Sequence, residues 1–325
     1  MKIDLKEAAE RLLSRDHILI LTHKNPDGDT LGSGYALCYA LQALGKEARV
    51  VCSDPVPRKY WYFTDHSAGN QLILPDDTFQ PDLIVASDIA DTQLFGTALE
   101  PFADRVDLCV DHHKSNVYYA RETYVDDTAS ATCEIVYDLL QLMGAQITPK
   151  IADCLYTGIA TDTGCFKFSN TTGKTHVTAA HLIDLGADYV AINRVMFDTK
   201  SRERILLEQM ALNSIEFAFD NRCAIILVSQ QMMQTSGADE SDLDGVSALP
   251  RQIEGVEVGI TIRERAEGGY KVSMRTTEKV DASVLCQSFG GGGHARAAGC
   301  TLEGTPKEVV TALLKATGRA LEACS

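Results

Sequence analysis

The sequence of 325 residues lacks several features that would each define a class of protein. No stretch approaches the roughly 18 consecutive apolar residues of a membrane span. The charged start Met1-Lys-Ile-Asp-Leu-Lys-Glu has no apolar core of the kind that a signal peptide needs. The ten cysteines form no Cys-x-x-Cys pair, which argues against zinc ribbons and dithiol redox motifs. We therefore expect a cytoplasmic protein with reduced cysteines and no membrane contact.

An excess of basic residues is also missing. The formal net charge is −15, which argues against sequence-blind binding to duplex DNA, because such binding needs a basic footprint. Small phosphate ligands stay compatible with this charge, since bound divalent ions can invert the local potential. The apolar fraction of 45% provides for a sizeable core, and the length suits two domains.

The first half of the chain alternates short apolar runs with helical patterns. This alternation predicts an α/β fold with a parallel sheet that helices cover on both faces. The expected strands are 17–22, 48–52, 83–87 and 106–110, and the expected helices are 30–44, 130–143 and 149–160.

The second half begins with a helical pattern and continues as a smaller α/β unit with a mixed sheet. A hairpin turn is expected at Glu267-Gly268-Gly269. The pattern predicts domains at 1–190 and 218–325, joined by a helical linker at 191–217. The segment 175–217 is expected to be helical throughout, with breaks near Gly186 and Thr199. Further helices are expected at 242–253, at 282–288 and from 306, and the expected strands are 223–228, 256–263, 270–275 and one near Ala298.

Acids and histidines follow three of the expected strands. The first strand ends at His23, the third at Asp88, and the fourth at Asp111-His112-His113, while Asp162 lies just past a helix. Ligands of open α/β sheets bind beyond the carboxyl ends of the strands. We therefore expect these side chains to meet at one edge of the sheet.

The loop from His23 to Asp29 shows how such a cluster could hold metal ions. Asp27 and Asp29 are two residues apart, so each can face a different ion. Carboxylates mixed with imidazole suit Mn²⁺, and less exclusively Mg²⁺, Fe²⁺ or Co²⁺. A single aspartate here is equally well explained as a helix cap or turn residue, but the whole set is not. Two ions about 3.5–4 Å apart would activate water and clamp a phosphoryl group, so phosphoester hydrolysis is the expected chemistry.

Taken together, these motifs resemble the DHH phosphoesterase superfamily. The matching segments are His-x-x-Pro-Asp-x-Asp-x-x-Gly-Ser at 23–33, Asp88, Asp-His-His at 111–113 and Thr-Asp-Thr-Gly at 161–164. Gly-Gly-Gly-His-Ala-Arg-Ala-Ala-Gly at 291–299 is similar to the signature of the associated C-terminal domain. The resemblance spans essentially the whole chain and is strongest to the oligoribonuclease and pAp-phosphatase (nanoRNase) subfamily.

The resemblance implies a role for each residue of the cluster. His23 and Asp27 would hold one ion, Asp29, His112 and Asp162 the other, and Asp88 would bridge them. His113 would face the scissile phosphate, and Asp111 would orient a histidine. Lys167 departs from the pattern, because many relatives carry arginine at this position.

The glycine run that precedes His294 allows the backbone to approach a ligand closely. With the resemblance, we expect a nucleotide-binding loop. Arg263 and Arg275 lie on the paired strands, where Arg263 is equally well explained as part of a solvated strand face, and Arg275 is favoured for phosphate. The expected substrate-binding residues are Arg275, Gly291, Gly292, Gly293, His294 and Arg296.

The resemblance leads to one function and leaves two alternatives open. We expect a hydrolase with two divalent ions, most simply Mn²⁺, that cleaves short RNA and dinucleotides such as pApA and converts pAp to AMP. One alternative is a phosphodiesterase acting on cyclic di-AMP or pApA. Another is a catalytically silent nucleotide-binding module, which would require a degenerate metal centre. Two copies could form a homodimer, and the sequence does not decide the oligomeric state.

Overall fold

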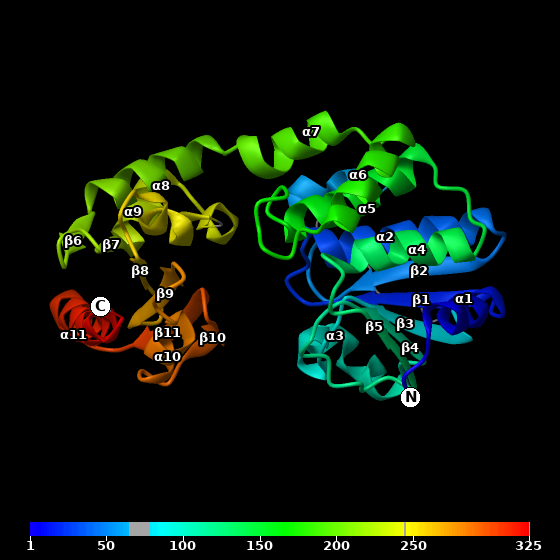
Figure 1. Cartoon of the computed structure of the whole chain (residues 1–325), viewed down its shortest axis with the longest axis horizontal. Coiled ribbons are helices and arrows are strands. Elements are labelled where there is room, and N and C mark those ends of the chain that lie inside the picture. Colours follow the sequence, from blue (N-terminus) through cyan, green and yellow to red (C-terminus); the bar gives the residue numbers. More distant parts are fainter. Residues whose placement is uncertain (65–78, 244, 325) are drawn as a thin grey trace. The chain divides into compact units, whose positions relative to one another are not determined.

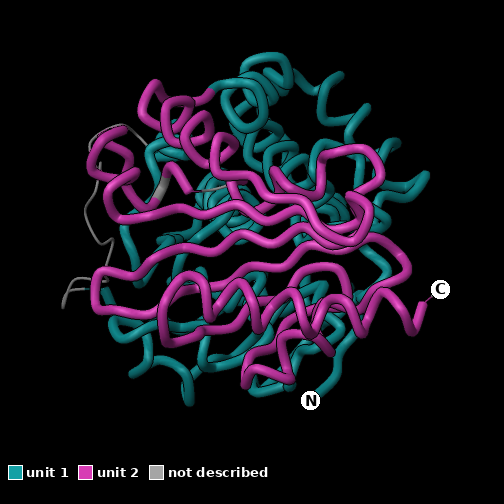
Figure 2. Tube along the Cα trace, turned by 90° about the vertical axis from the view of Figure 1, so that its left-hand side faces the viewer, with its two compact units in different colours: residues 1–199 teal, residues 200–325 magenta. Residues whose placement is uncertain are grey.

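The computed structural model describes residues 1–64, 79–243 and 245–324. The chain divides into two compact units, which Figure 2 colours separately: unit 1 is 1–199 and unit 2 is 200–325. The division falls inside the range 191–217 that the sequence analysis gives as a linker.

Unit 1 is built on a five-stranded parallel sheet with the order β2-β1-β3-β4-β5 (Figure 1). All five residues of β3 are buried, as is typical of a strand covered on both faces. The strand order reverses beside β1, which is where doubly wound sheets bind ligands. The strands are β1 (His17–Thr22), β2 (Glu47–Cys52), β3 (Leu83–Ser87), β4 (Leu108–Asp111) and β5 (Glu122–Val125).

Helices cover both faces of this sheet (Figure 1). Short helical segments lie on one face: η2 (Thr92–Phe95), α3 (Gly96–Leu99) and η3 (Glu100–Arg105). The other face carries the larger apolar core and the longer helices α1 (Leu5–Leu13), α2 (Gly28–Ala43), α4 (Thr132–Leu142), α5 (Pro149–Asp162) and α6 (Gly173–Asp184). Three short segments pack with them: η1 (Arg58–Phe63), α7 (Tyr189–Asn193) and the π-helical η4 (Arg194–Asp198).

Glycines let α2 and α5 pack unusually close together. A Cβ atom at Gly32 would lie 2.4 Å from the carbonyl oxygen of Cys154, and one at Gly28 would lie 2.3 Å from Oγ1 of Thr161. A larger side chain at either position would force the helices apart. This approach brings the first turn of α2 beside the last turn of α5.

Unit 2 is built on a six-stranded mixed sheet with the order β10-β11-β9-β8-β7-β6. Only β7 and β8 are parallel to each other. The strands are β6 (Glu216–Ala218), β7 (Cys223–Val228), β8 (Val258–Glu264), β9 (Tyr270–Thr276), β10 (Gly292–His294) and β11 (Ala297–Leu302).

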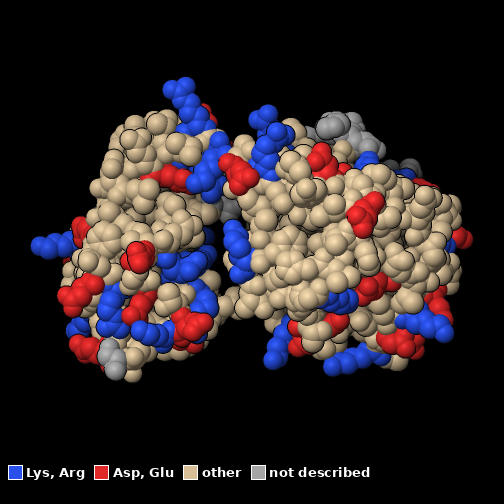
Figure 3. Space-filling view, turned by 45° about the horizontal axis from the view of Figure 1, so that its top comes forward, with Lys and Arg blue, Asp and Glu red and all other residues tan. Residues whose placement is uncertain are grey.

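Two separate apolar clusters cover the faces of this second sheet. α10 (Ala282–Gln287) and α11 (Pro306–Ala323) contribute to one cluster, and α8 (Arg202–Asn213) and α9 (Gln230–Ser236) to the other. Short 3₁₀ segments follow α9: η5 (Glu240–Leu243), η6 (Val246–Ala248) and η7 (Pro250–Gln252). On the face that Figure 3 shows, Lys and Arg side chains of unit 2 lie interspersed with Asp and Glu.

The predicted fold class is confirmed, but two local predictions are wrong. The helical stretch expected at 175–217, with breaks near Gly186 and Thr199, is confirmed up to Asn213, whereas Phe217 lies in β6, because the chain turns back at 219–221 with positive φ angles. The helix expected at 242–253 is a series of 3₁₀ segments around Asp244, which lies outside the described residues, since Gly245 at φ +84° and Pro250 interrupt it. The short strands β5 and β10 were not expected from the sequence.

All ten cysteines are free in the structure, and eight of them are buried. Among the described residues, no helix has both the length and the apolar character that crossing a bilayer requires.

Candidate metal centre

The sheet of unit 1 brings the predicted acids and histidines together at the carboxyl ends of its strands. His23 follows β1 directly, Asp88 follows β3, and Asp111 is the last residue of β4. The loop after β1 enters α2, where Asp27 is the N-cap residue and Asp29 lies in the first turn. Asp162 does not lie past a helix as predicted, because α5 continues through it.

These side chains form two groups that share one carboxylate. In the first group, Nε2 of His23 lies 3.6 Å from Oδ1 of Asp27 and 3.7 Å from Oδ2 of Asp88. In the second, Nε2 of His112 lies 3.8 Å from Oδ2 of Asp29 and 3.7 Å from Oδ2 of Asp162. Nε2 of His112 also lies 3.7 Å from Oδ1 of Asp88. The two oxygens of Asp88 therefore face different histidines, and His23, Asp27 and Asp88 on one side and Asp29, His112 and Asp162 on the other could each hold a metal ion. Asp88 and His112 also form a third such set with His113, whose Nδ1 lies 3.4 Å from Oδ1 of Asp88.

The shared residue Asp88 is held in an uncommon backbone conformation. Its φ angle is +62°, its amide donates to the carbonyl oxygen of Val110 at 3.0 Å, and Oδ1 accepts from Oγ1 of Thr132 at 2.9 Å. Aspartate and asparagine tolerate this left-handed region better than most residues. The turn directs the carboxylate back into the cluster as soon as β3 ends.

The start of α4 holds the buried Asp29. Its two carboxylate oxygens accept the amides of Thr132 at 2.7 Å and Cys133 at 2.9 Å. The first amides of a helix have no partner inside the helix and carry partial positive charge, so they stabilise an anion. These two hydrogen bonds stabilise the negative charge of Asp29, whose side chain is only 1% exposed.

His23 and His112 both turn Nε2 toward the acids and Nδ1 toward a backbone carbonyl oxygen. Nδ1 of His23 lies 2.8 Å from the carbonyl oxygen of Lys24, and Nδ1 of His112 lies 3.3 Å from that of Ala129. A proton on Nδ1 leaves Nε2 as an acceptor, which is how metal-binding histidines are commonly oriented. Among the described residues, Nε2 of His112 is buried and has no hydrogen-bond partner, so the cluster fits a cation at this point.

His113 lies at the edge of the cluster and is linked by hydrogen bonds to Asp111 and, through Asp111, to Asn116. Its Nδ1 lies 2.7 Å from Oδ1 of Asp111, and Nδ2 of Asn116 donates to Oδ2 of Asp111 at 2.6 Å. Asp111 is fully buried, whereas 43% of the His113 side chain is exposed. Asp111 therefore orients His113 and does not take part in the two ligand groups.

The pKa values of four residues in the cluster are raised, because several charged groups lie close together without a cation. Burial and the neighbouring Asp29 raise the pKa of Asp88 to about 7 and that of Asp162 to about 8. Burial alone would lower the pKa of His23, but the hydrogen bond and charge of Asp27 raise it to about 9. Hydrogen bonds to Asp111 and Asp88 raise the pKa of His113 to about 11. In the absence of metal the centre therefore retains protons, which cations would displace.

The predicted substrate residues of unit 2 lie around the hairpin of β10 and β11. Gly292 and Gly293 pair with Gly299 and Ala298, and β10 is exposed along its whole length. Arg296 donates from Nη1 to the carbonyl oxygens of Thr277 and Val280, at 2.6 and 2.9 Å. Its guanidinium therefore also fixes the loop before α10.

A row of paired residues places Arg275 and His294 on the same face of this sheet. Arg275 pairs with Ala297, which pairs with His294 on its other side. Directly opposed residues of neighbouring strands point to the same face, and strands are about 4.8 Å apart. The residue between the two longer side chains is the small Ala297.

The backbone of Arg251 lies against this row of paired residues at Gly259. Arg251 was not among the residues predicted to bind substrate. Gly259 pairs with Arg275, and a Cβ atom at Gly259 would lie 2.6 Å from the amide nitrogen of Arg251. Burial and the charge of Arg251 both lower the pKa of Arg275. Within the described residues, neither guanidinium has an ion pair with an acid. Gly259 between the apolar residues Val258 and Ile260 is the signal in the sequence, because a glycine inside a strand marks a close backbone approach.

Two other predicted cations are engaged elsewhere. Nη1 of Arg263 lies 2.6 Å from Oε2 of Glu240, which favours the reading as a surface strand residue. Nζ of the exposed Lys167 lies 5.9 Å from the ring centroid of Phe197. Both contacts lie outside the two ligand groups.

A doubly wound sheet whose strand ends bring three imidazoles and several carboxylates together defines a candidate metallohydrolase. Comparison with known families shows which family of hydrolases the chain resembles. Residues 17–159 match the DHH family N-terminal domain, and residues 225–323 match the DHHA1 domain. The bifunctional oligoribonuclease and PAP phosphatase NrnA of Thermus thermophilus is 35% identical over 88% of this chain and 84% of its own length. The chain belongs to the DHH family of phosphoesterases.

Further relatives agree with this assignment. The bifunctional oligoribonuclease and PAP phosphatase NrnA of Bacillus subtilis is 24% identical over 88% of this chain and 90% of its own length. An exopolyphosphatase-related protein of Bacteroides fragilis has the same fold, with a TM-score of 0.87, 24% identity and coverage of 98% and 97% of the two chains.

Proposed function

We propose that this chain is a phosphoesterase with two divalent cations that hydrolyses short RNA and dinucleotides such as pApA, and converts pAp to AMP. The observation that carries the proposal is the position of Asp88 between the two groups, with one oxygen facing His23 and the other facing His112. The choice of substrates rests on relatives named as bifunctional oligoribonuclease and PAP phosphatase over most of their length.

The proposed ligands follow the two groups. His23 and Asp27 would hold one ion, Asp29, His112 and Asp162 the other, and Asp88 would give one oxygen to each. Carboxylates with one imidazole per group suit Mn²⁺, with Mg²⁺ or Co²⁺ as further candidates. Bound cations would acidify a water molecule and neutralise charge on the phosphoryl group.

The chain's own residues would prepare the phosphate for attack. With Nδ1 directed at Asp111, His113 presents its Nε2 side toward the exposed edge of the cluster. The hydrogen bond to the buried Asp111 raises the pKa of His113, so Asp111 favours the protonated ring, whose Nε2–H can donate to a phosphate oxygen. Asp111 would hold the ring in this orientation, and Asn116 would hold Asp111.

Unit 2 would bind the nucleotide. The backbone of Gly291, Gly292 and Gly293 allows close approach, while His294, Arg275 and Arg296 would donate to phosphate and base. Arg251 would add a second guanidinium beside Arg275. A site of this kind recognises one nucleotide end and would favour short substrates over long polymers.

A Mn²⁺ assay of the purified chain tests the proposal with four substrates in parallel: pAp, pApA, a ladder of short RNAs and cyclic di-AMP. We expect AMP from pAp and pApA, and faster cleavage of the shortest RNAs. Lack of hydrolysis of all four would overturn the proposed function. Cleavage of cyclic di-AMP in preference would favour a second candidate, since a cyclic-di-AMP phosphodiesterase GdpP of Geobacillus thermodenitrificans is 25% identical over 88% of this chain.

A further inference from the structure

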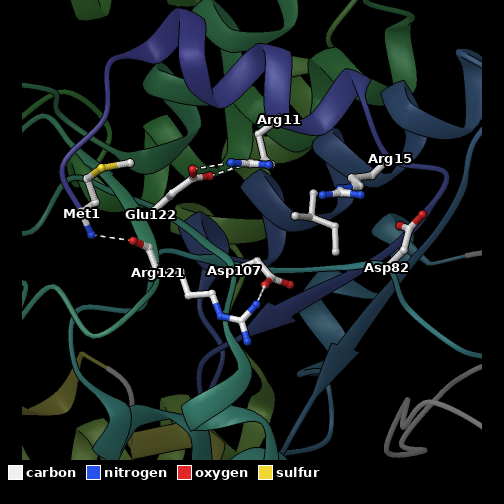
Figure 4. Close-up of a pocket in the computed structure, with 8 residues that line it drawn as sticks. Met1, Arg11, Arg15, Asp82, Asp107, Arg121 and Glu122 are labelled. Carbon is white, nitrogen blue, oxygen red and sulfur yellow. Dashed lines mark hydrogen bonds and ion pairs between the residues drawn. The ribbon is translucent and has the colours of Figure 1, made fainter.

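The charged side chains at the start of the unit 1 strands pair with one another. Nε of Arg11 donates to Oε2 of Glu122 at 2.6 Å. Nη1 of Arg121 donates to Oδ1 of Asp107 at 2.8 Å (Figure 4). Glu134 on α4 differs from these pairs, because it is only 1% exposed and its contacts lead toward the metal centre. A glutamate is rarely buried to this extent without a set of partners that needs it there.

The segment 129–133, which leads from the loop after β5 into α4, touches the ligands of the second group. All five of its residues are buried. The first two amides of α4 donate to the two carboxylate oxygens of Asp29. The carbonyl oxygen of Ala129 lies 3.3 Å from Nδ1 of His112. The segment therefore sets the position of two of the three ligands in this group.

Asn170 links the third ligand to the same segment. Its Nδ2 donates to the carbonyl oxygen of Ser130 at 2.9 Å and to Oδ2 of Asp162 at 3.3 Å. It also lies 3.2 Å from the carbonyl oxygen of Asp162, so this amide group faces acceptors only, as a donor should. Asp29, His112 and Asp162 thus all depend on the segment 129–133.

Glu134 holds this segment from inside the protein. Its Oε2 accepts the hydroxyl of Ser130 at 2.6 Å and the amide of Ser130 at 3.3 Å. The same oxygen accepts Oγ1 of Thr175 at 3.1 Å, and Nζ of Lys174 lies 3.6 Å from Oε1. A glutamate at the third position of a helix that reaches back in this way fixes the chain before the helix.

The N-cap of α4 makes this support necessary. The N-cap residue is Ala131, which has no side-chain acceptor for the first amides of the helix. Those amides are consequently available to Asp29, and their position depends on how firmly Ser130 is held.

The first ligand group is held by a different segment. Oδ1 of Asp27 accepts the amides of Asp29 and Thr30, at 3.0 and 3.1 Å. The amide of His23 donates to Oγ1 of Thr30 at 3.2 Å. These contacts stay within 23–30, so a change in the segment 129–133 should act mainly on the second group.

We propose that Glu134 and Asn170 are positioning residues for the second of the two cations, an inference that rests on the proposed function. Glu134 lies outside the ligand groups, and it acts by holding Ser130. Asn170 acts by joining Ser130 to Asp162. Residues that orient metal ligands in this way commonly change metal affinity about tenfold to a hundredfold when they are replaced.

A Mn²⁺ titration of the full chain after EDTA treatment tests this, with free Mn²⁺ measured by its EPR signal. We expect two bound ions in the unmodified chain. Glu134→Ala and Asn170→Ala should each weaken one ion about tenfold and the other less than about threefold, since Asp88 is shared. Glu134→Gln keeps an oxygen acceptor for Ser130 and should restore most of the affinity.

Two control variants remove comparable groups elsewhere. Asp138→Asn changes the other acid beside Lys174, and Asn193→Ala removes an amide that donates to the hydroxyl of Tyr156. Both should bind two ions as the unmodified chain does. In hydrolysis assays, Glu134→Ala should need about tenfold more Mn²⁺ for half-maximal activity and regain kcat at saturating Mn²⁺.

The outcomes separate this inference from the proposed function. Two ions bound equally well by the unmodified chain, Glu134→Ala and Asn170→Ala would overturn the inference alone. Equal weakening of both ions would also overturn it, because a general loss of structure would act on both groups. If Glu134→Ala does not fold, the partly exposed Asn170 gives the decision through Asn170→Ala. Fewer than two ions in the unmodified chain would overturn the proposed two-cation function, and this inference with it.

Discussion

The two proposed working regions of this chain are built in opposite ways. In unit 1 the acids are held by backbone amides, and Asp29, Asp88 and Asp111 are at most 2% exposed. In unit 2 the glycine strand β10 is exposed throughout, and the side chain of His294 has no hydrogen bond to the described part of the chain. We infer from this difference that the proposed metal centre is preorganised by the fold, whereas the proposed nucleotide loop would gain its partners from the substrate.

The largest expected effect comes from the residue shared by both ligand groups. Asp88→Asn keeps the shape and tolerates φ +62°, but removes the charge. We expect kcat with Mn²⁺ to fall at least about a thousandfold, together with loss of bound metal. Asp91→Asn is the matched control, because Asp91 caps η2 outside the cluster and asparagine can replace that cap. An Asp88→Asn variant with full activity would contradict the shared-carboxylate arrangement.

A smaller effect is expected one step away from the ligands. Asn116→Ala removes the donor to Asp111 and should loosen the orientation of His113. We expect kcat to fall about ten- to a hundredfold, with unchanged metal content and KM. Tyr119→Phe serves as control, since its hydroxyl donates to Ile89 and not to Asp111. An effect on KM alone would show that Asn116 does not act through His113.

The pH dependence of stability sharpens the picture of the metal-free centre. Because the pKa values of His23, Asp88 and Asp162 are raised, the folded chain holds more protons than the unfolded chain. The free energy of unfolding should therefore fall as pH rises from about 6 to about 8.5, by about 1.4 kcal/mol per pH unit for each retained proton. Urea unfolding in EDTA measures this slope, and Asp162→Asn should reduce it. A stability that rises over this range would show that the centre does not retain protons.

The smallest expected effect belongs to unit 2. Arg275→Gln should raise KM for pAp and pApA about tenfold and change kcat less than about twofold, because it removes contacts to the exposed substrate end. Metal content should stay the same. Arg265→Gln is the control, since Arg265 is engaged by Glu267 on the hairpin turn. A loss of kcat with unchanged KM would contradict the proposal that unit 1 carries catalysis and unit 2 carries substrate binding.

The same division explains which features could be predicted from the sequence. Buried parallel strands and the residues that follow them are local signals, so β1, β3 and the positions of His23, Asp88 and Asp111 were found. Asn116 and Thr132 were missed, because their contacts to Asp111 and Asp88 depend on how loops and α4 fold against the sheet. Arg251 was missed because it lies in a 3₁₀ segment that the sequence analysis read as a helix.

The central claim concerns the metal centre, and anomalous diffraction from crystals grown with Mn²⁺ tests it most directly. The account predicts two manganese peaks about 3.5–4 Å apart, one beside His23 and Asp27, one beside His112 and Asp162, with Asp88 between them. A single peak, or two peaks that do not share Asp88, would contradict it.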